Sequence, residues 1–153
     1  MRIATFALLI CLTLLVGCDP QPGKLRVPDS FVELSEAQAR PYQARAVSAD
    51  GVVVALRQQA NPKSGTLAFW TQAITDKMTK DKGYQLVSSE PLTSRTGRTG
   101  RKLHLTRTIR GVDFTYLMAI YVDGDRVRIA EAGGRTKHVQ PLIQELGESL
   151  GSL

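Results

Sequence analysis

The sequence predicts an α+β fold in which an antiparallel β-sheet is flanked by two main helices and follows an N-terminal signal peptide. Three observations predict it. The N-terminus is an apolar stretch too short for a membrane span. Two later segments carry apolar residues three or four positions apart, as helices do, and the remainder alternates apolar and polar residues between glycine-containing turns. The predicted order is hairpin, helix, antiparallel meander, helix.

The N-terminal segment has the features of a bacterial lipoprotein signal peptide. Arg2 supplies a positive charge, and a mainly apolar stretch runs to Val16. It ends in Leu15-Val16-Gly17-Cys18, which resembles the lipobox, where the cysteine is acylated and the chain is cut before it. We therefore predict that residues 1–17 are removed and that Cys18 carries a covalent lipid. The alternatives are an ordinary signal peptide with a chance cysteine and an uncut membrane anchor.

The residues after Cys18 bear on location. Residues 18–24 contain two prolines and a glycine and are predicted to be the lipidated cysteine and a short flexible tether. Asp19 resembles the residue that retains lipoproteins in the inner membrane of enteric bacteria. The lipoprotein pathway attaches two or three acyl chains, and two already give stable attachment. We expect a lipid-anchored protein of the cell membrane that faces the periplasm or the outside, with the inner membrane favoured.

Charge and cysteine content limit the partners. The chain has a net charge of +6, of which Arg2 leaves with the signal peptide. A basic protein suits an acidic partner or an anionic membrane surface. Nucleic acid is not expected, because an exported protein rarely meets it. Cys11 is also removed and Cys18 is lipidated, so neither a disulfide nor a cysteine metal site is expected.

The first half of the domain reads as an extended segment, a hairpin and a helix. Residues 25–33 are predicted to be extended, and residues 42–48 and 52–58 to pair around Asp50-Gly51, a favoured hairpin turn. A helix is predicted over 66–82 and should end at Gly83. Its apolar face consists of Leu67, Trp70, Ile74 and Met78.

The second half reads as a meander followed by a helix. Strands are predicted over 84–89, around Leu103 and Leu105, over 112–122 and over 126–131, with turns at Gly111 and at Asp123-Gly124-Asp125. Pro91 should restrict the first of these strands to a sheet edge or mark a bulge. Gly133-Gly134 is read as the turn into a last helix over 136–150, whose buried stripe is Val139, Leu142, Ile143, Leu146 and Leu150. Residues 25–153 are thus predicted to be a single α+β domain.

Several short sequences carry a resemblance to a known family. They are Val27-Pro28-Asp29-Ser30-Phe31, Phe69-Trp70, Gly83-Tyr84, Gly97 with Gly100, Tyr116, and Glu131 with Gly133. In this order, with these elements, the domain resembles the PsbP/Mog/DcrB superfamily, whose members share an antiparallel sheet flanked by helices. The resemblance implies a non-enzymatic scaffold, because relatives are extrinsic subunits of membrane complexes, binding adaptors or envelope lipoproteins. It supplies no catalytic residues.

The residues themselves also give no catalytic or metal site. The only histidines, His104 and His138, fall in different elements, and no Gly-x-Ser-x-Gly nucleophile motif exists to pair with either. The carboxylates do not form a ligand-spaced cluster. Asp123-Gly124-Asp125 lacks the other ligands of a calcium loop. We therefore expect no enzyme, no metal and no cofactor other than the lipid on Cys18.

A basic segment is the main candidate for binding. It runs from Ser94 to Lys102 and contains four cations, Arg95, Arg98, Arg101 and Lys102, interleaved with glycine and threonine. Arginine forks could hold phosphates or carboxylates of a partner. The alternative is a solvated loop whose charge serves solubility.

Three further features have a functional and a structural reading. Glu131 reads as a buried acid paired with an arginine, either functional or structural. Gly133-Gly134-Arg135-Thr136 could bind an anion on its amides if it opens a helix, although an ordinary helix-entry turn explains it too. Phe69 and Trp70 read as interface anchors or as core.

Two functions remain open. The leading hypothesis is a membrane-anchored envelope lipoprotein that acts as a non-enzymatic protein-interaction or assembly/accessory module, with another envelope protein or an anionic surface as partner. The alternative is a tethered carrier of a small ligand or lipid, held in a cleft between sheet and helix. A carrier should contain a closed apolar cavity, whereas an interaction module should expose a binding patch. The sequence does not indicate an oligomeric state.

Overall fold

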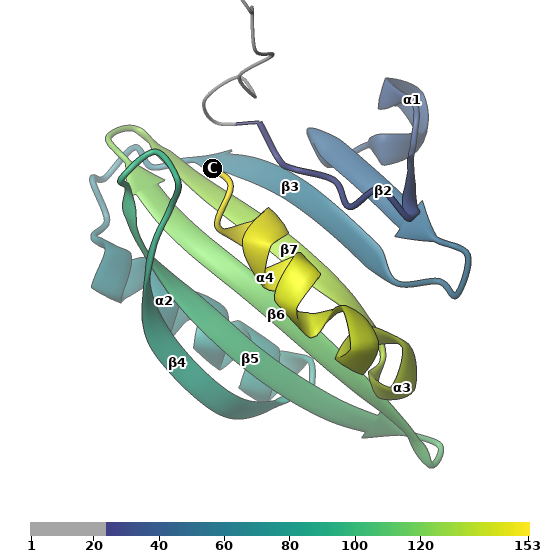
Figure 1. Cartoon of the computed structure of the whole chain (residues 1–153). Helices are drawn as coiled ribbons and strands as arrows, with labels where there is room; N and C mark the ends of the chain where they lie inside the picture. The colour runs from purple at the N-terminus through teal and green to yellow at the C-terminus, as the bar shows by residue number, and fades with distance from the viewer. Residues whose placement is uncertain (1–23) are drawn as a thin grey trace, which may run out of the picture.

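The computed structural model describes residues 24–153, and its core is one seven-stranded antiparallel sheet. The strand order is β1-β2-β3-β7-β6-β5-β4, with helical segments on both faces of the sheet (Figure 1). The α+β prediction is confirmed at this level. Residues 1–17, Cys18 and Asp19 lie outside the described residues, so the predictions made for them stay predictions. In the described part, no helix has the length and apolarity needed to cross a membrane.

The elements follow the predicted order, with one short helix added. The strands are β1 (Phe31–Glu33), β2 (Ala44–Ser48), β3 (Val53–Ala60), β4 (Gln85–Thr93), β5 (Thr99–Ile109), β6 (Val112–Asp123) and β7 (Arg126–Arg135). The helices are α1 (Glu36–Ala39), α2 (Leu67–Asp76), α3 (Thr136–Val139) and α4 (Ile143–Leu150). A π-helical turn (Lys77–Asp81) continues α2, and a 3-10 turn (Gln140–Leu142) joins α3 to α4.

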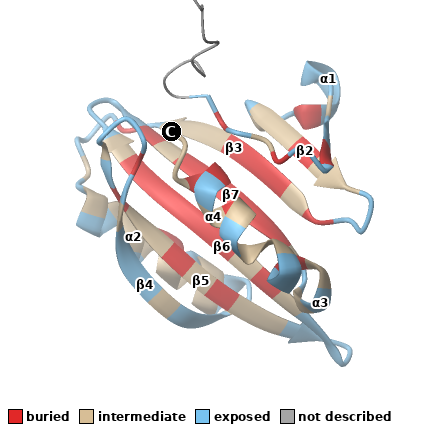
Figure 2. Ribbon diagram, in the orientation of Figure 1, coloured by how far each residue is buried: buried red, intermediate tan, exposed pale blue. Residues whose placement is uncertain are grey.

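Both faces of the sheet are buried, each against different helices. Neighbouring residues of a strand point to opposite faces. In β6, Tyr121 packs with Leu146 and Leu150 of α4, whereas Met118 packs in a second cluster with Ile74 of α2. Buried residues therefore run continuously along the middle of β6 and β7 (Figure 2). The alternation in residues 112–122 predicts one apolar face, made by Val112, Phe114, Tyr116, Met118, Ile120 and Val122. The structure also buries Leu117, Ala119 and Tyr121 of the opposite face, in the cluster with α4.

Local signals fixed several boundaries. Gly51 lies in the predicted β2–β3 turn with a φ of 77°. The side chain of Thr66 caps α2 by accepting a hydrogen bond from the backbone N–H of Phe69 at 3.1 Å. Gly83, with a φ of 69°, follows the helical segment as predicted.

The predicted Gly133-Gly134 turn is wrong, because both glycines lie inside β7. Gly133 pairs with Val53 on one side and Tyr116 on the other. A Cβ on Gly133 would lie 2.5 Å from Cδ2 of Tyr116, so glycine is needed there for close packing. The two glycines therefore belong to the sheet, and only Arg135, as the N-cap, and Thr136 of the predicted anion-binding segment lie at the N-terminus of α3. The last helix is also interrupted, since Pro141 lies in the 3-10 turn between α3 and α4.

Neither edge strand of the sheet is both long and regular. β4 forms one edge and contains Pro91, which confirms the edge position predicted for that residue. The β4–β5 register also shifts between Leu86 and Ser88. The opposite edge is β1, which has three residues.

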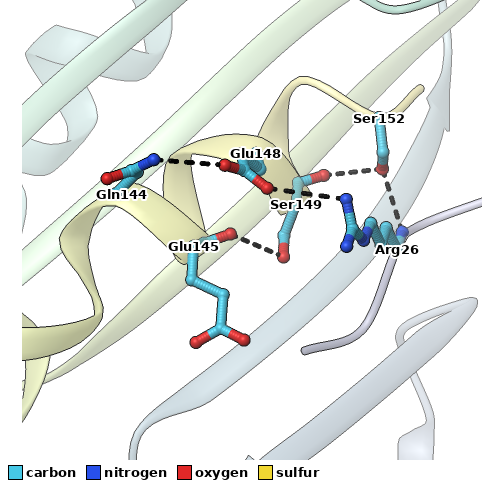
Figure 3. A network of polar contacts seen from close by, with 6 residues as sticks. All are labelled: Arg26, Gln144, Glu145, Glu148, Ser149 and Ser152. Carbon is cyan, nitrogen blue, oxygen red and sulfur yellow. Dashed lines mark hydrogen bonds and ion pairs between the residues drawn. The ribbon is translucent and has the colours of Figure 1, made fainter. Parts of the chain in front are cut away.

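The C-terminal residues hold both the start of the domain and the β4–β5 turn. The backbone N–H of Arg26 donates to Oγ of Ser152 at 2.9 Å, and its guanidinium lies 3.5 Å from Glu148 (Figure 3). Leu25 is buried in the cluster under α4. From the turn, the Thr96 hydroxyl donates to the carbonyl of Leu153 at 2.7 Å. The chain thus enters the domain on the α4 face of the sheet.

The buried Tyr121 side chain is expected to make the folded state less stable in alkaline solution. The side chain is fully buried and its hydroxyl donates to the carbonyl of Leu150 at 2.9 Å. Burial raises the pKa of Tyr121 to about 12, above its ordinary value of about 10. Because the folded-state pKa is the higher one, the stabilisation is complete below pH ~10 and is lost as pH rises from about 10 to about 12.

We expect the free energy of unfolding to fall across this window, and to fall less steeply in Tyr121→Phe. Urea titrations at a series of pH values measure both curves, and a residual slope is expected because burial and the Glu131 charge also raise the pKa of Tyr116. Parallel curves for the two proteins would contradict the prediction.

Candidate functional site

A buried carboxylate with two partners lies on the α2 face of the sheet. Glu131 of β7 is 5% exposed. One of its oxygens accepts a hydrogen bond from Nε of Arg57 in β3, and the other accepts one from the hydroxyl of Tyr116 in β6. The sequence predicted a buried acid paired with an arginine here, and the pairing is confirmed. The three side chains connect three adjacent strands of the sheet.

Tyr116 is held as a hydrogen-bond donor. Burial, the negative charge of Glu131 and the hydrogen bond to it together raise the pKa of Tyr116 well above its usual value. The phenol therefore stays protonated at any physiological pH. Each oxygen of Glu131 thus accepts one hydrogen bond from within the protein, which fixes the orientation of the carboxylate.

Two hollows lie on either side of this cluster and share three walls, Tyr42, Tyr116 and Glu131. The first has a volume of about 250 Å³ and is also lined by Arg45 and Tyr84. The second, of about 380 Å³, reaches α2. Its further charged walls are Arg57, Lys77 and Lys82. The two hollows adjoin one another at these three residues, and together they are called the depression here.

The depression is positively charged and aromatic. Of its four cations, only Arg57 has an ion pair within residues 24–153. The guanidinium of Arg45 lies over the ring of Tyr42, 5.7 Å from its centroid. Next to it, the rings of Tyr84 and Tyr116 are 5.7 Å apart, and Arg107 lies 5.8 Å from the Tyr84 centroid. The rings of Tyr42 and Tyr84 thus contact the guanidinium groups of Arg45 and Arg107, and neither arginine has an ion pair within residues 24–153.

The predicted basic segment does not converge on one site. The backbone N–H of Arg95 donates to the carbonyl of Gly151, and its side chain is exposed. Arg98 lies 3.6 Å from Asp123, and Lys102 lies 3.1 Å from Glu90. Arg101 lines a separate hollow beside Leu67 and Thr71 of α2. Because Arg101 and Lys102 are neighbours in β5, they point to opposite faces.

The other residues considered in the sequence, two aromatic residues and two histidines, do not come together in one site. Phe69 is 58% exposed, whereas Trp70 is half-buried and donates from Nε1 to Asn61 at 3.0 Å. His104 is half-exposed on the face of β5 opposite the α2 cluster. His138 lies 3.9 Å from Asp50. Between residues 24 and 153, no three His, Cys, Asp or Glu side chains form a group that could hold a metal ion.

Comparison with known proteins finds similarity in structure but not in sequence. No family model and no curated protein matches the chain. The solution structure of cyanobacterial PsbP (CyanoP) from Synechocystis sp. PCC 6803 superposes with a TM-score of 0.62, covering 82% of each chain at 11% identity. The fold of this chain is PsbP-like. PA94 from Pseudomonas aeruginosa, a protein of unknown function, superposes with a TM-score of 0.52 over 81% of this chain and 87% of its own, at 14% identity.

These identities show the fold alone. The PsbP-like fold confirms that part of the resemblance that concerned the arrangement of sheet and helices. A shared fold does not imply a shared function, which depends on the particular site that a protein carries. The depression around Glu131 is the candidate for that surface here.

Proposed function

We propose that this chain is a membrane-anchored envelope lipoprotein whose PsbP-like domain acts as a non-enzymatic protein-interaction or assembly/accessory module. The observation that carries the proposal is the depression around Glu131, where aromatic rings lie beside cations that have no ion pair within residues 24–153. Aromatic residues and arginines are enriched in protein interfaces, where they supply most of the binding energy.

The polar contacts of Glu131 fit a structural role within a recognition site, because Arg57 and Tyr116 each donate to one of its oxygens and hold the carboxylate in place. The alternative function, a small-ligand or lipid carrier, would be favoured by an enclosed apolar cavity. Both hollows are open to solvent and have charged walls, which favours the interaction module.

The path of the chain fits a tethered module. Leu25 begins the domain on the α4 face, whereas the depression lies on the α2 face. The described chain therefore begins on the face opposite the depression, so that a domain anchored through Cys18 could keep the depression accessible to a partner. We also propose the inner membrane as the location, on the basis of Asp19.

The lipid anchor is tested by Cys18→Ala. We expect the unchanged chain to incorporate a labelled fatty acid and to stay in the membrane fraction, because Cys18 is the predicted acylation site. Cys18→Ala should incorporate none and keep residues 1–17. Cys11→Ala is the matched control, since this cysteine lies in the segment to be removed and its loss should change neither result. Labelled Cys18→Ala protein would rule out the anchor.

A further inference from the structure

We propose that the depression around Glu131, termed here the Glu131 groove, is a docking site for an acidic segment of a partner polypeptide. The groove consists of the two adjoining hollows around Glu131 and Tyr116, and its other polar and aromatic walls are Tyr42, Arg45, Arg57, Lys77, Lys82 and Tyr84. This inference rests on the proposed function, because it names the partner chemistry of the same interaction module.

Charge is the first argument. Four cations line the groove against one carboxylate, and Arg57 already neutralises that carboxylate. Arg45 is half-buried and held over Tyr42, while Lys77 and Lys82 are exposed at the rim. Partly buried charges are screened less by salt than fully exposed ones. The groove therefore offers Asp or Glu side chains cations that have no partner within residues 24–153.

Shape is the second argument. The two hollows adjoin at Tyr42, Tyr116 and Glu131, which suits a chain segment that places one side chain in each. Sites for small molecules enclose most of the ligand surface, and these open hollows do not. A flat bilayer would meet the rim lysines, but Arg45 and Arg57 lie half-buried within the hollows and would be out of its reach. The rings of Tyr42 and Tyr84 would pack against the partner's apolar atoms.

The test measures binding of a fluorescent peptide of alternating glutamate and tyrosine to the lipidated full-length protein in neutral detergent. A glutamine–tyrosine peptide is the charge control. The triple variant Arg45→Gln, Lys77→Gln, Lys82→Gln removes three groove cations and leaves Arg57 with Glu131. The matched variant Arg95→Gln, Arg98→Gln, Arg101→Gln removes three cations from the basic segment. Thermal melting verifies that each variant is folded. If the triple groove variant is not folded, the single variants Arg45→Gln and Lys82→Gln are measured in its place.

We expect the acidic peptide to bind more weakly as salt rises, and the groove variant to raise Kd by about tenfold. The basic-segment variant should change Kd by less than about twofold. Equal weakening in both variants would show attraction by net charge alone and overturn the proposal, as would no binding of the peptide. Site-dependent binding to anionic lipid vesicles without peptide binding would assign the groove to a membrane surface instead.

The same titration with Cys18→Ala separates the inference from the proposed anchor. Peptide affinity is expected to be unchanged, because Cys18 is not part of the groove. If Cys18→Ala protein still incorporates lipid but the groove variant loses the peptide, only the anchor at Cys18 fails. If Cys18→Ala protein incorporates no lipid, but the groove variant and the basic-segment variant bind the peptide with the same Kd, only the groove inference fails.

Discussion

Arg57→Ala is expected to lower the free energy of unfolding by about 3 kcal/mol, the low end of the cost of breaking a buried ion pair. The Glu131 side chain is only 6% exposed, so loss of the guanidinium leaves a buried carboxylate with Tyr116 as its remaining donor. The Arg57 side chain itself is 34% exposed, and the reverse change, Glu131→Ala, should cost less because water can solvate the freed cation. Urea denaturation of the two variants measures the difference.

Two further variants control for this result. Arg126→Ala removes an arginine whose 3.7 Å pair with Asp125 is solvent-exposed, and it should change stability by less than about 1 kcal/mol. Arg57→Met with Glu131→Leu removes both charges and should recover much of the loss, since no unpaired charge stays buried. A stability of Arg57→Ala equal to that of Arg126→Ala would mean that the pair contributes little.

Gly100→Ala is expected to destabilise the protein by about 2 kcal/mol, because a methyl group does not fit there. Its Cβ would lie 2.6 Å from the ring of Tyr121 and 2.8 Å from the backbone oxygen of Ile120. Tyr121 has little freedom to move, since it is fully buried and hydrogen-bonded to the carbonyl of Leu150. Denaturation midpoints and the tyrosine signals of the folded protein report the change.

Gly147→Ala is the matched control and should act in the opposite direction. Gly147 lies in α4, and a Cβ there would meet nothing within 4 Å. Alanine in a helix is favoured over glycine by about 0.5–1 kcal/mol, so this variant should gain stability. If both glycine variants lose stability equally, the loss reflects the strain of any added methyl group and not the contact with Tyr121.

The order of elements was predictable because short-range signals mark their ends. Asp50-Gly51 specifies a hairpin turn, and Gly83 ends a helical segment, without reference to any distant residue. The β7 strand was predicted too short for the opposite reason. Two adjacent glycines look like a turn locally, but Gly133 is required by Tyr116 across the sheet and Gly134 by Val52, contacts that no local pattern reveals.

The candidate site was predictable only in part. Glu131 was predicted as a buried acid at a strand end, but its partner Arg57 lies on β3, which pairs with β7 although the two residues are 74 apart in the sequence. Strand order of this kind does not follow from periodicity. Conversely, Arg101 and Lys102 are adjacent in sequence and looked like one cluster, although alternation along β5 sends them to opposite faces.

The irregular edges of the sheet have a consequence for how this protein behaves when many copies are crowded together. A long, regular edge strand exposes unpaired N–H and C=O groups and invites other chains to add strands, which leads to aggregation. Here β1 offers only three residues, and β4 carries Pro91, which has no N–H, and a register shift after Leu86. Val32 and Val87 are exposed on these same edge strands. Without the irregularities, their apolar side chains would favour association between the edges of different copies. Copies held at high local concentration would therefore resist merging into a shared sheet.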